Sequence, residues 1–229
     1  KALNADLFFV VAFRMLPAAV FEMPPLGCVN LHASLLPQYR GAAPINWAVI
    51  NGETQTGCTT FFIEQKIDTG KIIFQETTDI LPNETAGELH DKLMKMGANL
   101  VLKTAKALES GDFPQVEQAK SDDLRTASKI FKETCEINFN QTTKQVFDFV
   151  RGMSPYPAAF TILQGKKMKI FRAEKIETAH EHEIGSFQTD GKKYLHFATK
   201  DGYIAVTELQ LQGRKSMKID AFLRGYKFS

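Results

Sequence analysis

The sequence lacks the features that mark several specialised classes of protein. Only three of its 229 residues are cysteine and one is tryptophan, and its longest continuously apolar run covers residues 7–13. A helix that crosses a membrane needs about 18 apolar residues, so this run predicts a buried strand instead. Neither sign of charge is in large excess, because 28 basic residues accompany 26 acidic ones. This balance excludes a uniformly basic nucleic-acid coat and an acidic disordered chain.

The cysteines Cys28, Cys58 and Cys135 do not form the pattern of a disulfide framework or a zinc site. They are odd in number and contain no CxxC spacing. We therefore expect each to be a small buried hydrophobe in a reducing compartment. Nothing at the start of the sequence resembles a signal peptide. These observations predict a cytoplasmic protein without a membrane anchor.

The first half alternates between strand-like and helix-like segments. The strand-like segments are residues 7–13, 27–32, 57–64 and 71–80. Residues 43–51 have the composition of a helix, and Thr85 with Glu88 forms a capping box that opens a second, long helix. This alternation predicts an α/β domain over residues 1–113, with an open, mainly parallel, Rossmann-like sheet.

The second half contains one amphipathic helix followed by short strands. Residues 143–151 carry inward-facing apolar side chains, Val146, Phe149 and Val150, at helical spacing. The strand-like segments after this helix are residues 159–163, 168–173, 194–199 and 203–211. Such short strands predict a small antiparallel, OB-like β-barrel over residues 131–229. Between the two halves, the polar residues 114–130 lack a sustained period and predict a linker.

The two halves differ in charge. Residues 1–130 hold 12 basic and 15 acidic side chains, a net charge of −3, whereas residues 131–229 hold 16 and 11, a net charge of +5. The basic residues that we single out are Lys166, Lys167, Lys169, Arg172, Arg214 and Lys215. A small basic barrel is suited to hold a phosphate backbone. From charge alone, lysines that protect exposed strand edges explain the pattern equally well.

Asn30, His32 and Asp68 are the candidate catalytic side chains. Asn30 and His32 are two residues apart at the end of a predicted buried strand, so their side chains share one face. An amide and an imidazole can donate hydrogen bonds to a developing oxyanion, and a carboxylate such as Asp68 can accept a proton or position a water. Taken alone, a satisfied core histidine and a turn aspartate explain these residues better than catalysis does.

The segments around these residues resemble those of the folate-dependent formyltransferases. The main block covers residues 27–45, GCVNLHASLLPQYRGAAPI. Two shorter blocks follow in the family's order, TGCT at residues 56–59 and IDTG at residues 67–70. Residues 154–159, SPYPAA, and residues 209–225 are similar to the later part of those members that formylate methionine carried by initiator tRNA. The resemblance runs nearly end to end.

The resemblance implies an enzyme that transfers a formyl group from 10-formyltetrahydrofolate to the amino group of methionine on initiator tRNA, in translation initiation. Asn30, His32 and Asp68 match the family's catalytic positions. The residues that match its folate-binding loop are Ser34, Leu35, Leu36 and Pro37. Arg40 and the six basic residues singled out above are expected to contact the tRNA. No metal is implied, and we expect a monomer.

The sequence departs from the family pattern at a predicted turn and at its start. Tyr156 stands where tryptophan is usual, and Ala159 follows Ala158 without the usual glycine. The chain opens at Lys1, and residues 7–13 resemble a middle strand of the family's sheet. We therefore expect about three βα units, of roughly 30 residues each, to precede this segment in a complete domain.

Other functions fit parts of the sequence. A related enzyme of the same chemistry would formylate a small amine or a sugar nucleotide, or hydrolyse the formyl-folate. A non-catalytic RNA-binding module would need only the basic second half. A Rossmann-like nucleotide enzyme is excluded because no GxGxxG follows a strand. His180 and His182 alternate with Glu181 and Glu183, a run that we interpret as solvated rather than metal-binding.

Overall fold

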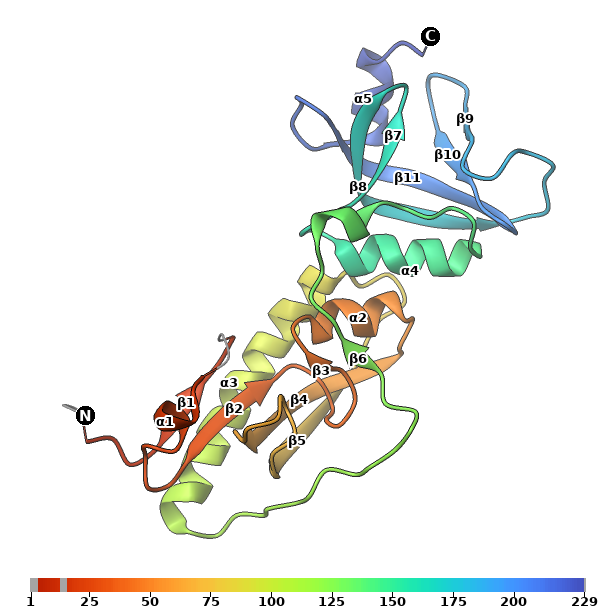
Figure 1. The fold of residues 1–229 in the computed structure, drawn as a ribbon. Coiled ribbons are helices and arrows are strands. Elements are labelled where there is room, and N and C mark those ends of the chain that lie inside the picture. Colours follow the sequence, from red (N-terminus) through yellow and green to blue (C-terminus); the bar gives the residue numbers. More distant parts are fainter. Residues whose placement is uncertain (1–3, 13–15, 229) are drawn as a thin grey trace. The chain divides into compact units, whose positions relative to one another are not determined.

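The computed structural model describes residues 4–12 and 16–228, which form two compact units (Figure 1). The first unit is built from the chain up to Ala48, from Thr54–Leu81 and from Glu88–Lys129. The second is built from Val49–Glu53, Pro82–Gly87 and the chain from Ile130 onward. Each unit has its own hydrophobic core. Among the described residues, no helix is both long enough and apolar enough to cross a membrane.

The first unit contains a four-stranded sheet with the strand order β1-β2-β4-β5. Its strands are β1 (Phe8–Val10), β2 (Cys28–His32), β4 (Gln55–Phe62) and β5 (Ile72–Asp79). β1 runs parallel to β2, whereas β4 pairs antiparallel with both β2 and β5. The β4–β5 connection is too short for the crossover that parallel strands need, so these strands form a hairpin. The predicted α/β class is confirmed, and within the described residues the pairing is mixed rather than mainly parallel.

The prediction of a strand over residues 7–13, buried on both faces, is wrong in extent and burial. β1 covers only Phe8–Val10, its residues are half-buried, and Val11 is 57% exposed. In the described part of the chain, β1 pairs with β2 alone, so its other edge has no strand partner there. Phe13, the last residue of the predicted strand, lies outside the described residues.

Three helices accompany this sheet: α1 (Ala18–Phe21), α2 (Pro44–Ile50) and α3 (Ala86–Ser110). α2 begins at Pro44, where the fixed φ of proline suits the first helical turn and its missing N–H is not needed. α3 begins directly after Thr85, as predicted, and runs along one face of the sheet (Figure 1). A Cβ on Gly97 of α3 would lie 2.7 Å from the side chain of Leu31. Because Gly97 has no side chain, α3 can pack closely against β2, the strand that carries Asn30 and His32.

Residues 114–129, which make up most of the predicted linker, pack along the first unit, and we call them the strap. Its β6 (Thr126–Ala127) pairs in parallel with β3 (Arg40–Gly41). Val116 and Ile72 exchange two backbone hydrogen bonds of 2.8 and 2.9 Å. Nε1 of Trp47 donates to the carbonyl oxygen of Ser128 at 2.7 Å. The strap therefore belongs to the hydrogen-bonded structure of the first unit.

The second unit is a curled antiparallel sheet with two α-helices (Figure 1). Its strands are β7 (Ala159–Leu163), β8 (Lys166–Glu177), β9 (Phe187–Thr189), β10 (Leu195–Ala198), β11 (Gly202–Leu211) and β12 (Met217–Lys218). Its helices are α4 (Thr143–Met153), α5 (Ile219–Gly225) and a 3-10 turn over Lys132–Cys135. The strand order is β7-β8-β11-β10-β9, with β12 added to β11. Because the described β7 and β9 do not pair with each other, the sheet is a half-barrel of the predicted antiparallel kind.

The core of the second unit lies between α4 and one face of this sheet. Val146 and Val150 point into it as predicted and are 0% and 1% exposed. Phe149 is only half-buried, and Phe147 is the buried aromatic side chain of this helix instead. From the sheet, Phe197 stacks on Phe139 with 5.1 Å between ring centroids. The apolar face of α4 thus includes Phe147 as well as the predicted Phe149, which packs against the core as a half-buried side chain.

The three cysteines are all buried and free. Burial raises the pKa of each thiol. For Cys58, burial and then the nearby Glu76 carboxylate raise the pKa to about 12. The prediction that they act as small buried hydrophobes is confirmed.

Asp201 ties the start of α4 to the sheet and makes the second unit sensitive to acid. Oδ1 of Asp201 accepts hydrogen bonds from N and Oγ1 of Thr143, at 2.6 and 2.8 Å. These two bonds, the backbone one first, lower the pKa of Asp201. A lowered pKa in the folded state stabilises the fold above the unfolded pKa, and this stabilisation is lost as pH falls through the folded value. The bonds therefore stabilise the unit at neutral pH and fail in acid.

We expect Asp201→Ala to lower the free energy of unfolding of the second unit by about 0.5–1 kcal/mol at pH 7, because the start of α4 loses two hydrogen bonds. The effect is small because solvent screens the exposed carboxylate. The difference from wild type should shrink as the pH is lowered below about 4. Urea unfolding followed by circular dichroism at pH 7 and pH 3.5 measures both values. Glu181→Gln, which removes an exposed carboxylate of the same unit, is the matched control. A deficit that stays constant between the two pH values would contradict the explanation.

Candidate active site

Two of the predicted catalytic side chains lie on β2, which is flanked by β1 and β4. Asn30 and His32 occupy alternate positions of this strand, so their side chains emerge on one face. Both are buried, with 4% and 6% of their surface exposed. Oδ1 of Asn30 is buried without a hydrogen-bond partner. An unsatisfied buried acceptor costs about 1–3 kcal/mol, which a ligand that donates a hydrogen bond would remove.

The imidazole of His32 is oriented by a backbone carbonyl group. Its Nε2 lies 2.8 Å from the carbonyl oxygen of Tyr39. Because a carbonyl oxygen can only accept, Nε2 carries the hydrogen, and Nδ1 is the nitrogen that remains for chemistry. Nδ1 lies 3.8 Å from Oδ2 of Asp68, which is longer than a hydrogen bond. The structure thus brings His32 and Asp68 together, with Nδ1 as the ring nitrogen nearest the carboxylate.

Asp68 lies in the connection between β4 and β5. Its φ angle is 54°, in the left-handed region that residues other than glycine rarely adopt. The backbone N–H of Gly41 donates to Oδ2 of Asp68 at 2.9 Å. Gly41 itself pairs with Ala127 of the strap, and a Cβ on Gly41 would lie 2.4 Å from the carbonyl oxygen of Ala127. The carboxylate is therefore held by a loop that the strap holds in turn.

The loop after β2 contains the residues predicted to bind folate, Ser34, Leu35, Leu36 and Pro37. Two side chains of the β4–β5 hairpin fix its backbone. Oγ1 of Thr59 donates to the carbonyl oxygen of Ser34 at 2.6 Å and accepts from the N–H of Leu36 at 3.2 Å. Nε2 of Gln75 donates to the carbonyl oxygen of Leu36 at 2.9 Å. Thr59 belongs to the TGCT block at residues 56–59, but no role of its own was predicted for it. Gln75 was not singled out, because it is an ordinary polar residue of a strand.

Arg40, predicted to contact tRNA, is tied to the strap. Its Nε and Nη2 donate to Oε1 of Gln118 at 3.1 and 2.7 Å. The neighbouring Tyr39 donates from its backbone N–H to the carbonyl oxygen of Arg125 at 2.7 Å. Tyr39 lies within the main block at residues 27–45, but its backbone carbonyl was given no role there. Gln118 was not singled out, because a glutamine in a polar stretch carries no motif.

Four of the predicted RNA contacts lie at one end of the paired strands β8 and β11 in the second unit. Lys166 and Lys167 begin β8, while Arg214 and Lys215 follow β11. The backbone N–H of Gln212 donates to the carbonyl oxygen of Lys167 at 2.8 Å. This bond places the two segments side by side. We call these four residues the basic edge.

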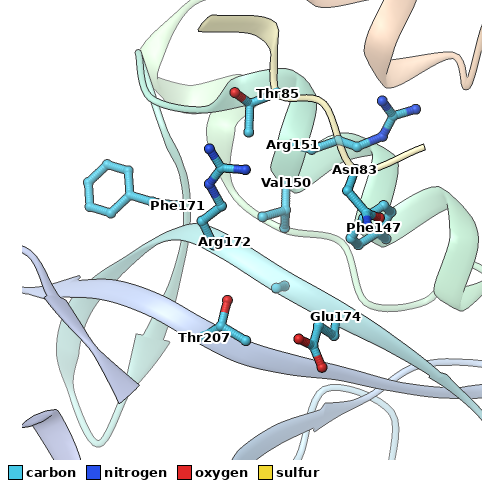
Figure 2. Close-up of a pocket in the computed structure, with 10 residues that line it drawn as sticks. Asn83, Thr85, Phe147, Val150, Arg151, Phe171, Arg172, Glu174 and Thr207 are labelled. Atoms are coloured by element: carbon cyan, nitrogen blue, oxygen red, sulfur yellow. The ribbon is translucent and has the colours of Figure 1, made fainter. Parts of the chain in front are cut away.

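Arg172, also predicted to contact tRNA, lines a cavity of about 190 Å³ in the second unit. Figure 2 shows that the lining side chains come from α4, β8 and β11 and from the segment before α3. On the α4 side, Arg151 donates from Nε to Oδ1 of Asp148 at 2.7 Å and from Nη1 to the carbonyl oxygen of Glu84 at 3.0 Å. Lys169, the remaining predicted contact, is half-buried on β8. The predicted basic residues of this unit therefore lie on β8 and directly after β11.

The histidines of the polar run at residues 180–183 have partners within the protein. Nε2 of His180 donates to the carbonyl oxygen of Thr199 at 2.9 Å. Nδ1 of His182 lies 2.6 Å from the hydroxyl group of Tyr203. Within residues 4–12 and 16–228, no group of three or more histidine, cysteine, aspartate or glutamate side chains is arranged to hold a metal ion.

This chain belongs to the formyl transferase family, and its two units correspond to the two domains of that family. Residues 1–105 match the family model described as formyl transferase. Residues 129–227 match the model described as formyl transferase, C-terminal domain. The family predicted from the sequence blocks is confirmed.

Two similar relatives are named methionyl-tRNA formyltransferase. The chain is 53% identical to that of Bacteroides thetaiotaomicron, over 99% of this chain and 73% of the relative. It is 54% identical to that of Parabacteroides distasonis, over 99% of this chain and 73% of the relative. Identity at this level extends through both units rather than through the catalytic blocks alone.

Solved structures share the fold. HypX from Aquifex aeolicus, in complex with tetrahydrofolic acid, superposes with a TM-score of 0.69 at 22% identity. The match covers 96% of this chain but 38% of HypX. At this identity the likeness establishes the fold and no more.

Proposed function

We propose that this protein transfers the formyl group of 10-formyltetrahydrofolate to the α-amino group of methionine on initiator tRNA, for translation initiation in the cytoplasm. The observation that carries the proposal is the 53% identity, over 99% of the chain, to a methionyl-tRNA formyltransferase. The proximity of His32 to Asp68 on the face that Asn30 shares supports the same chemistry. We assign formyl transfer to residues 1–113 and tRNA binding to residues 131–229, in a protein that acts as a monomer.

In the proposed reaction the neutral amine attacks the formyl carbon, a new C–N bond forms, and the formyl oxygen becomes an oxyanion. The amide of Asn30 and the protonated ring of His32 donate hydrogen bonds to this oxygen. His32 donates through Nδ1, because its Nε2–H is directed to the carbonyl oxygen of Tyr39. The unpartnered Oδ1 of Asn30 is free to accept an N–H of the attacking amine.

Asp68 moves the protons in this scheme. The amine loses a proton as it attacks, and N10 of the folate gains one as the bond from N10 to the formyl carbon breaks. Oδ2 of Asp68 lies 3.8 Å from Nδ1 of His32, so the carboxylate is close to the reacting atoms and is suited to take up the amine's proton and return it to N10. The overall step is a transfer between two amines, so no oxidant or reductant is consumed.

Folate and tRNA are assigned to different parts of the chain. The loop Ser34, Leu35, Leu36 and Pro37 would hold the folate, supported by its rigid attachment to Thr59 and Gln75. The basic edge of the second unit would hold tRNA phosphates, supported by four cationic side chains on adjacent segments. Arg40, Lys169 and Arg172 remain proposed tRNA contacts outside that edge.

Acceptor specificity tests the proposal. Given 10-formyltetrahydrofolate, the full-length protein should formylate methionyl-tRNA and leave an amino-sugar nucleotide unmodified. Chromatography of both products measures the two rates. The double variant Lys166→Gln/Lys167→Gln should raise KM for methionyl-tRNA about tenfold and weaken its salt dependence. Lys192→Gln/Lys193→Gln, which removes the same charge from an exposed turn of the same unit, is the matched control. Transfer to the amino sugar but not to methionyl-tRNA would overturn the proposed function.

A further inference from the structure

We propose that Gln118 of the strap is a positioning residue that holds Asp68 in place for formyl transfer. The inference rests on the proposed function, because it concerns the carboxylate to which that function assigns proton transfer. It depends on the hydrogen bonds of one side chain, which connects the strap, β3 and the connection between β4 and β5. Gln118 lies in the polar segment that the sequence predicts as a linker.

The amide of Gln118 makes as many hydrogen bonds as an amide can. Its Nε2 donates to the carbonyl oxygens of Asp68 and Gly70, at 2.9 and 2.8 Å. Its Oε1 accepts from Nε and Nη2 of Arg40, at 3.1 and 2.7 Å. An amide has two donor hydrogens and two acceptor lone pairs, so all four positions are used. The orientation is also unambiguous, because the reverse one would set oxygen against two carbonyls and NH₂ against a guanidinium.

The two donated bonds hold the backbone at, and two residues after, a residue in an unfavourable conformation. Asp68 has a φ angle of 54°, and such backbone costs about 1–3 kcal/mol unless its surroundings impose it. The carbonyl groups of Asp68 itself and of Gly70 are both anchored to the same nitrogen atom. This anchoring restrains the turn from the main-chain side, while the Gly41 N–H restrains the carboxylate at Oδ2.

The backbone of the strap fixes the position of Gln118. Two residues earlier, Val116 exchanges backbone hydrogen bonds with Ile72, the first residue of β5. Further along, Ala127 pairs with Gly41. Gln118 is therefore held between two points of attachment to the same unit, and its side chain transmits that rigidity to Asp68.

Two substitutions separate this role from a merely structural one. Gln118→Glu keeps two acceptor oxygens for Arg40 but loses both donors and sets a carboxylate oxygen against the carbonyls of Asp68 and Gly70. Gln118→Met keeps the length and removes all four bonds. Gln115→Ala, at an exposed position of the same strap, is the matched control.

We expect both Gln118 variants to lower kcat for methionyl-tRNA about tenfold to a hundredfold, with KM for both substrates within about twofold of wild type. The amide of Gly41, which is bonded to Oδ2 of Asp68, should exchange with deuterium about tenfold faster in Gln118→Glu than in wild type. Steady-state kinetics well below the melting temperature and hydrogen exchange read by mass spectrometry measure the two effects. Gln115→Ala should change neither.

Gln118→Glu with wild-type kcat and unchanged exchange at Gly41 would overturn the proposal. So would a lowered melting temperature with unchanged kcat, since that is the effect of a purely structural bond. If the wild-type protein failed to formylate methionyl-tRNA, the proposed function would fall, and the exchange rate at Gly41 would still decide whether Gln118 positions Asp68.

Discussion

Replacing Asp68 with asparagine should lower kcat for formyl transfer to methionyl-tRNA about a thousandfold. An asparagine cannot take up the proton that the attacking amine releases, and loss of a general base typically costs a factor of about 10²–10⁴. The amide oxygen of an asparagine is still able to accept the Gly41 N–H that now bonds Oδ2, at 2.9 Å. The loop geometry should therefore survive, and KM for folate and tRNA should stay near the wild-type values. Single-turnover formylation with saturating substrates measures the chemical step directly.

Asp79→Asn provides the control for this experiment. Asp79 is an exposed carboxylate at the other end of the same hairpin, so its loss changes the net charge equally and leaves the site untouched. It should retain wild-type kcat. An Asp68→Asn enzyme within about tenfold of wild type would remove Asp68 from the proton-transfer role.

Gly70→Ala should damage both stability and turnover. A Cβ at this position would lie 1.8 Å from the carbonyl oxygen of Phe62 and 2.9 Å from its carbonyl carbon. Both atoms are backbone, so the connection between β4 and β5 has to move, which costs about 3 kcal/mol in the free energy of unfolding. The movement displaces Asp68, two residues away, and we expect kcat to fall about a hundredfold. Denaturant unfolding and steady-state kinetics check the two effects.

Gly111→Ala shows what a glycine substitution costs without crowding. Gly111 has a φ angle of 74°, but nothing lies within 4 Å of the position that a Cβ would occupy there. Only the left-handed backbone conformation is penalised at this residue, by about 1 kcal/mol, and kcat should not change. Equal losses of stability and equal kcat in the two alanine variants would show that the Phe62 carbonyl does not crowd residue 70.

The parts of the site that a local sequence pattern describes could be predicted, and Asn30 with His32 is the clearest case. Alternation along a strand places both side chains on one face whatever surrounds the strand, and the structure has them on β2. The formyltransferase blocks identified the family, and they also singled out Asp68 at a distance of 36 residues from His32. The alternation along the strand and the composition of the turn do not by themselves show that Asp68 lies next to His32.

The strap could not be predicted, for a physical reason. Its attachments are isolated groups of hydrogen bonds made by unlike parts of the chain, such as the side chain of Gln118 and the backbone of Val116. Such contacts leave no periodic pattern of apolar residues, which is the signal that reveals helices and strands. β6 consists of two residues, and a two-residue strand is too short to produce an alternation. A polar stretch with these properties has the composition of a linker even when it is part of the site.

The pairing of β3 with β6 also sets an order for assembly. Arg40 and Thr126 are brought together across roughly 85 residues of chain, and closing so long a loop costs entropy before it gains contacts. Asn30, His32 and Asp68 leave the ribosome early, whereas the groups that restrain their loops, on Gln118 and Ala127, follow much later. A growing chain therefore carries every proposed catalytic residue for some time without a completed site. Assembly is delayed until synthesis has passed Ala127.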